Sequence, residues 1–135
     1  MTRPLFGTRE VYDALAESLN EDPKWLAKAQ VLNYTMTHVY TEPLNKTFTF
    51  RFEAGKLLDV REVVGPAPAD FVLSGSPETW ERMLVLQTIT PQIALVTRKI
   101  HVDGSMTTLL KNISVFNYLL AVLTGLDPVM SPDER

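Results

Sequence analysis

The sequence contains no cysteine, only two histidines and no long apolar run. Without cysteine the chain cannot form disulfides, use a thiolate nucleophile or build a cysteine-based zinc site. No stretch approaches the ~20 consecutive apolar residues that are needed to span a bilayer. Residues 1–7 also lack the apolar run of a signal peptide, so we expect a cytoplasmic protein.

The charge balance is weakly negative, which bears on the partners to expect. The chain of 135 residues carries a formal net charge of -3. It therefore has no strong positive field with which to gather phosphate backbones, and we expect no nucleic-acid partner. Its length suits a single domain over residues 1–135. We expect an ordered core over residues 8–124, followed by a loose tail over residues 125–135 that contains two prolines and a charged end.

The first secondary-structure signals along the chain are helical. Within residues 8–20, Val11, Leu15 and Leu19 recur every fourth residue, as on the buried face of an amphipathic helix. The Asp-Pro pair at 22–23 places a capping residue before a proline in the first helical turn. It predicts a second, short helix.

Alternating side chains then predict a sheet. Phe48, Phe50 and Phe52 point to one face of a strand while the polar residues between them point to the other. The tight Ala-Gly-Lys connection at 54–56 makes this strand one arm of an antiparallel hairpin. In total we expect five strands, over residues 34–40, 46–53, 57–64, 70–74 and 98–103.

The remaining helices complete the fold class. Ser-Pro and Thr-Pro pairs at 76–77 and 90–91 predict two further helix starts, and a long helix is expected over residues 105–124. Helices gathered beside a mostly antiparallel, five-stranded sheet define the α+β class.

The last of these helices is more apolar than packing on a sheet requires. Residues 115–123 are apolar almost all round, broken by Asn117, whereas a surface helix needs only an apolar stripe. The surplus is consistent with a solid core, with a ligand cavity lined by the same residue types, or with a partner interface. The pattern alone does not distinguish these interpretations.

Candidate catalytic residues are sparse. His101 lies between Ile100 and Val102, so we expect it to face solvent from a strand. His38 shares a strand face with Met36, and we interpret it either as a buried polar group or as a contact to a ligand head group. There is no G-x-S-x-G nucleophile elbow and no glycine pattern for nucleotides. We therefore expect no enzyme, no cofactor and no metal site.

Three segments together resemble a known family. Residues 69–76 read Ala-Asp-Phe-Val-Leu-Ser-Gly-Ser, residues 91–96 read Pro-Gln-Ile-Ala-Leu-Val, and residues 99–104 read Lys-Ile-His-Val-Asp-Gly. Their order and spacing resemble the sterol carrier protein 2 (SCP2) family. One position departs from the family pattern, because Arg98 stands where the family has a glycine. That glycine is expected to serve a turn with positive φ, which arginine adopts reluctantly.

The resemblance implies an SCP2-like fold with an apolar tunnel between the sheet and the helices. It also implies non-catalytic binding of sterols, fatty acids, fatty acyl-CoAs or phospholipids. The implied lining comes from the phenylalanine strand, the middle helices and the last helix: Phe48, Phe50, Phe52, Met83, Leu84, Ile89, Ile93, Leu95, Phe116, Leu120 and Leu123.

These observations favour a carrier of an apolar small molecule, such as a lipid, with the last helix as a lid. The alternative is an accessory or dimerisation module of a larger enzyme system, for example one that binds isoprenoid quinone intermediates. In that case the last helix is an interface, so a homodimer stays open. Arg98, Lys99, His101 and Lys111 form either a solvated face or a weakly basic patch for transient contact with an anionic membrane or an acyl-CoA phosphate.

Overall fold

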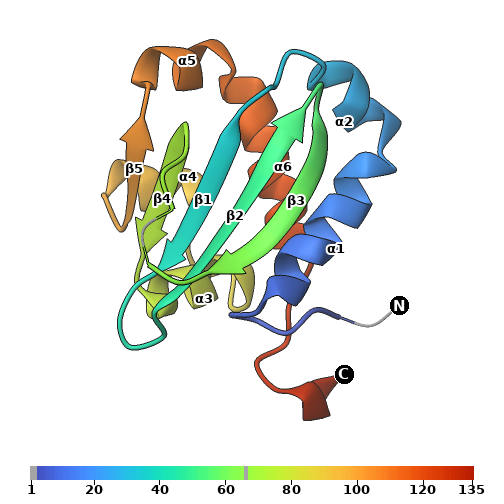
Figure 1. Ribbon diagram of the computed structural model, residues 1–135. Coiled ribbons are helices and arrows are strands. Elements are labelled where there is room, and N and C mark those ends of the chain that lie inside the picture. Colours follow the sequence, from blue (N-terminus) through green and yellow to red (C-terminus); the bar gives the residue numbers. More distant parts are fainter. Residues whose placement is uncertain (1–2, 66) are drawn as a thin grey trace.

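The computed structural model describes residues 3–65 and 67–135, which form a sheet with helices on one face (Figure 1). The strands are β1 (Thr35–Tyr40), β2 (Lys46–Glu53), β3 (Lys56–Val63), β4 (Phe71–Gly75) and β5 (Ile100–Gly104). They are ordered β3-β2-β1-β4-β5, and within the described residues β1 and β4 are parallel while the other neighbours are antiparallel. The α+β class and the mostly antiparallel sheet are confirmed.

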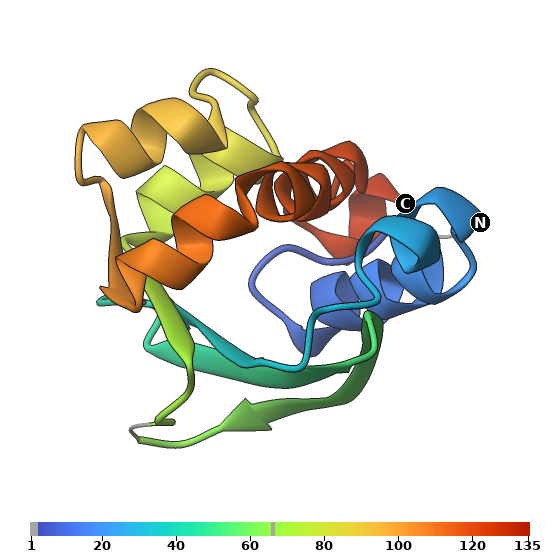
Figure 2. The same ribbon diagram turned by 90° about the horizontal axis from the view of Figure 1, so that it is seen from above.

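The helices lie together on one side of the sheet, as the view in Figure 2 shows. They are α1 (Arg9–Asn20), α2 (Pro23–Lys28), α3 (Pro77–Leu84), α4 (Pro91–Val96), α5 (Met106–Lys111), α6 (Ile113–Gly125) and the short 3-10 helix η1 (Pro132–Glu134). The cap-then-proline pairs mark helix starts as expected, because the Asp22, Ser76 and Thr90 side chains each accept a backbone N–H of the first turn. In α1 the buried residues include Val11, Leu15 and Leu19, which confirms the predicted apolar stripe.

The hairpin between β2 and β3 is fixed to α2 at a glycine. Gly55 has a φ of +85°, and a Cβ there would lie 2.7 Å from the carbonyl oxygen of Ala29. Its own carbonyl oxygen accepts a hydrogen bond of 2.7 Å from the Trp25 indole nitrogen. Only glycine satisfies both the left-handed backbone and this close approach.

The final helix is not continuous, which corrects the expectation of a single helix over residues 105–124. One helix ends at Lys111 and the next begins at Ile113. Asn112 between them has φ −115° and ψ 25°, outside the helical range, and its side-chain amide donates to the carbonyl oxygen of Thr108 at 3.0 Å. An asparagine side chain that bonds to nearby backbone competes with helix continuation, and the periodicity of apolar residues does not reveal this.

The tail that was expected to be loose lies against the N-terminal segment. Val129 forms a parallel bridge with Leu5, and the Val129 N–H donates to the Pro4 carbonyl oxygen at 2.8 Å. The Val129 side chain is only 2% exposed. An ion pair between Arg3 and Asp127 joins the same two segments. The sequence pattern could not indicate this contact, because the two partners lie at opposite ends of the chain.

None of the helices in the described part of the chain is long and apolar enough to cross a membrane.

Candidate ligand-binding site

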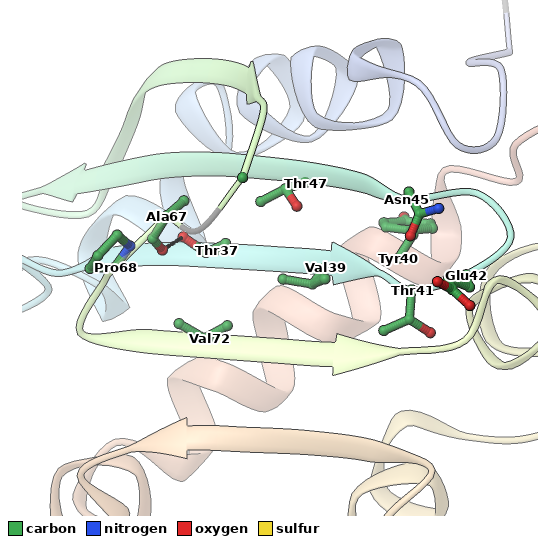
Figure 3. A pocket seen from close by; sticks show the side chains of 11 residues that line it. Thr37, Val39, Tyr40, Thr41, Glu42, Asn45, Thr47, Ala67, Pro68 and Val72 are labelled. Carbon is green, nitrogen blue, oxygen red and sulfur yellow. Dashed lines mark hydrogen bonds between the residues drawn. The ribbon is translucent and has the colours of Figure 1, made fainter.

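One hollow, which we call the outer groove, lies on the outer face of the sheet, opposite the helices (Figure 3). It has a volume of about 540 Å³ and lies between the strands and the connection from β3 to β4. Its wall mixes threonines such as Thr37 and Thr47 with apolar side chains such as Val39 and Val72. It is open to solvent, and the Thr37 hydroxyl in its wall already donates to the Ala67 carbonyl oxygen at 3.0 Å.

A second hollow, the inner cavity, lies inside the molecule, between the sheet and helices α4, α5 and α6. It measures about 30 Å³. The sheet contributes Met36, Phe71, Leu73 and Val102 to its wall. The helices contribute Leu95 from α4, Leu109 from α5, and Ile113, Phe116, Asn117, Leu119 and Leu120 from α6. Every one of these side chains except Asn117 is apolar, so this inner cavity is the site suited to an apolar molecule.

The inner cavity is too small for a lipid as it stands. A volume of about 30 Å³ holds a water molecule or a methyl group, whereas ligand pockets are typically ~300–1,000 Å³. A molecule of lipid size would therefore fit only if the helices moved away from the sheet. Within α5, which the structure describes in full, no residue is buried, so moving this helix would break few packing contacts.

The residues predicted to line a tunnel fall into several groups. Leu95, Phe116 and Leu120 lie in the wall of the inner cavity. Four others are buried in the core without reaching that wall: Met83, Leu84, Ile89 and Leu123. Ile93 is 52% exposed on the outer side of α4.

The three phenylalanines of β2 lie under a different set of helices. The Tyr12 ring of α1 stacks on Phe48 and on Phe50, with centroid distances of 4.9 and 5.5 Å. The Trp25 ring of α2 lies 5.8 Å from that of Phe52. All three phenylalanines are at most 1% exposed. This end of the sheet is filled by protein side chains, and the inner cavity lies at the other end.

Most of the cavity wall was missed by the sequence interpretation. Met36 and Val102 follow the strand alternation, and Leu109 and Ile113 follow the helical spacing, so the face of its element on which each lies could be predicted. That these residues meet at one cavity could not be predicted from the sequence. It depends on the parallel pairing of β1 with β4, which brings β4 and β5 beneath α5 and α6.

A short chain of buried polar groups lies on the inner face of β1. The Tyr12 hydroxyl is 2.9 Å from the Tyr40 hydroxyl and 2.9 Å from Nδ1 of His38. The His38 ring stacks on Trp80 with a centroid distance of 5.0 Å. Burial lowers the pKa of His38 to about 3, so the imidazole is neutral at physiological pH. Burial also raises the pKa of Tyr12 and of Tyr40, so both keep their hydroxyl protons.

The second histidine is placed as expected. His101 is exposed on β5, while Ile100 beside it is buried. Among the described residues there is no group of three or more His, Asp or Glu side chains that could hold a metal ion.

The loop before β5 keeps the backbone that the family glycine implies. Arg98 has a φ of +60°, and the N–H groups of Arg98 and Lys99 donate to the carbonyl oxygens of Leu95 and Ala94 at the end of α4. A left-handed residue just after a helix is usually glycine, because a side chain there is strained. The substitution therefore changes the residue but not the turn.

A mixed sheet with helices on one face and an apolar cavity between them places the chain among α+β proteins with an interior apolar site. The model of the SCP-2 sterol transfer family matches residues 13–117, and the chain belongs to that family.

Solved structures share the fold. A crystal structure of sterol carrier protein 2 has a TM-score of 0.76 at 21% identity, covering 87% of this chain and 96% of that one. A conserved hypothetical protein of Thermus thermophilus, described as a candidate sterol carrier protein, has a TM-score of 0.77 at 20% identity, covering 96% and 94%. The ubiquinone synthesis protein UbiJ-SCP2 has a TM-score of 0.56 at 13% identity, covering 82% and 90%. No curated protein sequence matches the chain significantly.

Proposed function

We propose that this chain binds and carries an apolar small molecule of lipid size, without catalysing its conversion, between the sheet and helices α4 to α6. The observation that carries the proposal is the inner cavity, with its apolar wall, in a member of the SCP-2 sterol transfer family. Burying ~400 Å² of apolar ligand surface would contribute about 10 kcal/mol before the costs of association and ordering. Micromolar affinity with loose selectivity among chain lengths is the expected result.

A matched pair of substitutions tests where the ligand binds. Val102 points into the inner cavity from β5, and Val72 lines the outer groove from the neighbouring strand β4. Val102→Phe should reduce binding at least tenfold by filling the cavity, while Val72→Phe should leave it unchanged. The measurement is displacement of a fluorescent fatty-acid methyl ester by sterols, acyl esters and quinones, with circular dichroism to show that both variants fold.

Native mass spectrometry of protein purified without detergent supplies a second measurement, in which a carrier shows bound lipid. Loss of binding in Val72→Phe alone would move the site to the outer groove. Failure of every apolar probe to bind the wild-type chain would end the proposal.

The surroundings of the cavity support loading of the ligand from an anionic membrane. Val96 of α4 and Leu110 of α5 are 81% and 63% exposed, although Leu95 and Leu109 beside them line the cavity. Residues 83–124 contain three basic side chains and one acidic one, in a chain whose net charge is -3. Exposed apolar side chains within a locally basic segment suit a surface of anionic lipid.

Vesicle sedimentation tests this contact. The double substitution Val96→Ser with Leu110→Ser should lower binding to vesicles that contain phosphatidylglycerol. Val64→Ser, at an exposed valine on the connection after β3, is the matched control and should not lower it. If the wild-type chain instead forms a dimer that the double substitution dissociates, the alternative of a dimerisation module is supported and the membrane contact is contradicted.

A further inference from the structure

His38 has a buried polar atom in the core. The carriage of a pure hydrocarbon would not explain why a polar atom is there. The His38 side chain is 1% exposed, and its Nε2 atom is buried without a hydrogen-bond partner among the described atoms. Its other ring nitrogen, Nδ1, is paired with the Tyr12 hydroxyl, which is paired in turn with the Tyr40 hydroxyl. An unpaired buried polar atom is costly, so it needs an explanation.

The hydrogen-bond chain indicates which ring nitrogen of His38 carries the proton. If Tyr40 donates to Tyr12 and Tyr12 donates to Nδ1, both hydroxyl protons are used, and the proton of the neutral imidazole lies on Nε2. If Nδ1 donates to Tyr12 instead, one hydroxyl proton is left without an acceptor in addition to the unpaired Nε2 atom. The first arrangement leaves fewer unpaired groups. His38 therefore presents an Nε2–H donor.

The imidazole lies next to residues of the inner cavity. Leu73 is the partner of His38 in the pairing of β1 with β4, and Met36 precedes His38 on the same face of β1. Both Leu73 and Met36 are in the cavity wall. A cavity that widens along β1, as a lipid-sized ligand requires, reaches His38 next.

We propose that the Nε2–H group of His38 donates a hydrogen bond to an oxygen of the carried ligand, so that the site selects uncharged apolar molecules bearing a carbonyl, ester or hydroxyl oxygen. This inference rests on the proposed carriage of an apolar molecule in the inner cavity. It adds a polar anchor to a site that is otherwise apolar, and it names the chemical class of the ligand.

The selected oxygen is uncharged because the interior offers nothing to balance an anion. The low pKa of His38, about 3, keeps the ring neutral. Every Asp, Glu, Lys and Arg that the structure describes reaches the surface. A carboxylate buried there would have no counter-ion, and burying an unpaired charge costs far more than burying an ester or a hydroxyl group.

Two probes of matched chain length test the anchor: methyl dodecanoate, which has an ester, and dodecane, which has no acceptor. Both are supplied from the same cyclodextrin carrier. The wild-type chain should bind the ester about tenfold more tightly, as expected for one buried hydrogen bond. In His38→Phe, which retains a ring to stack on Trp80, this preference should disappear through weaker binding of the ester alone. His101→Phe, at the exposed histidine of β5, is the control and should keep the preference.

A spectroscopic measurement on the wild-type chain needs no variant. With ¹⁵N-labelled histidine, the Nε2–H proton of His38 should move downfield when methyl dodecanoate binds but not when dodecane binds. Equal binding of the two probes, or an unmoved Nε2–H signal with the ester bound, would overturn the anchor while leaving carriage intact. Failure of both probes to bind would overturn carriage and the anchor with it.

Discussion

The two halves of the inner face of the sheet are built differently. Over β2 and β3, aromatic rings fill the space, as when Tyr12 stacks on Phe48 and Phe50 beneath α1. Over β4 and β5 the wall is mainly aliphatic, and a cavity remains beneath α5 and α6. Rings held by stacking on both sides leave no room for a ligand, whereas aliphatic side chains under a lightly packed helix can separate. We therefore expect most of the stability to come from the half with the stacked rings, and the proposed binding site lies in the other half.

The largest expected difference between the halves is in the free energy of unfolding that is lost when a buried side chain is replaced by alanine. Phe50→Ala should lower the free energy of unfolding by about 3–5 kcal/mol, because it leaves a cavity among the rings of the filled half. Leu109→Ala, in the wall beneath α5, should cost less than ~1.5 kcal/mol, since its side chain is only half-buried. Urea denaturation of both variants measures this. Similar losses at the two positions would contradict the division into two halves.

The polar chain beside the boundary of the halves should make stability depend on pH. The folded pKa of His38, about 3, lies below its unfolded value of about 6.5, so below pH 6.5 the unfolded chain binds a proton that the folded chain does not. Stability should therefore fall as pH falls from 6.5 towards 3, by at most about 1.4 kcal/mol per pH unit from this residue.

Denaturation of the wild-type chain and of His38→Phe across this range isolates the contribution. The pKa of Asp22 is lowered mainly by its hydrogen bond from the Tyr118 hydroxyl, so Asp22 also makes stability fall as the pH falls. Because Asp22 is present in both proteins, its contribution cancels in the comparison. The variant should show the shallower slope. Parallel slopes would mean that His38 is not protonated on unfolding as its burial requires.

The smallest expected effect concerns strain in the half that holds the cavity. Arg98 has a φ of +60°, a conformation that glycine adopts without cost. Arg98→Gly should raise the free energy of unfolding by roughly 0.5–1 kcal/mol, after allowing for the greater entropy of glycine in the unfolded chain. Thr97→Gly is the control, because Thr97 has a φ of −84° and should only lose stability. Thermal denaturation of both variants decides whether the turn is strained.

The sequence predicted the helices and strands better than it predicted the tertiary contacts between them. The alternation of Phe48, Phe50 and Phe52 correctly indicated a strand with one buried face, and the capping residues located most helix starts. The resemblance to the family identified Arg98 as the position of a left-handed turn, and the structure retains that turn. These features are local, so a single sequence contains them.

The cavity depends on contacts that no local pattern encodes. Tyr12 and His38 are 26 residues apart, and their hydrogen bond depends on how α1 packs against the sheet. The break at Asn112 depends on one side-chain hydrogen bond within an otherwise helical stretch. The phenylalanines look like a ligand-binding surface in sequence, but the placement of Tyr12 and Trp25 above them turns that surface into core.

The bridge between Leu5 and Val129 has a consequence for how the molecule can open. It restrains the chain just after the C-terminal end of α6, whereas the N-terminal end of that helix follows Asn112, whose side chain provides no cap. The Tyr118 hydroxyl, which donates to Asp22, also holds the middle of α6, so the first turn of this helix is the part that can move. The aperture for a ligand would then form beside α5, and the stacked rings under α1 would stay closed while it does.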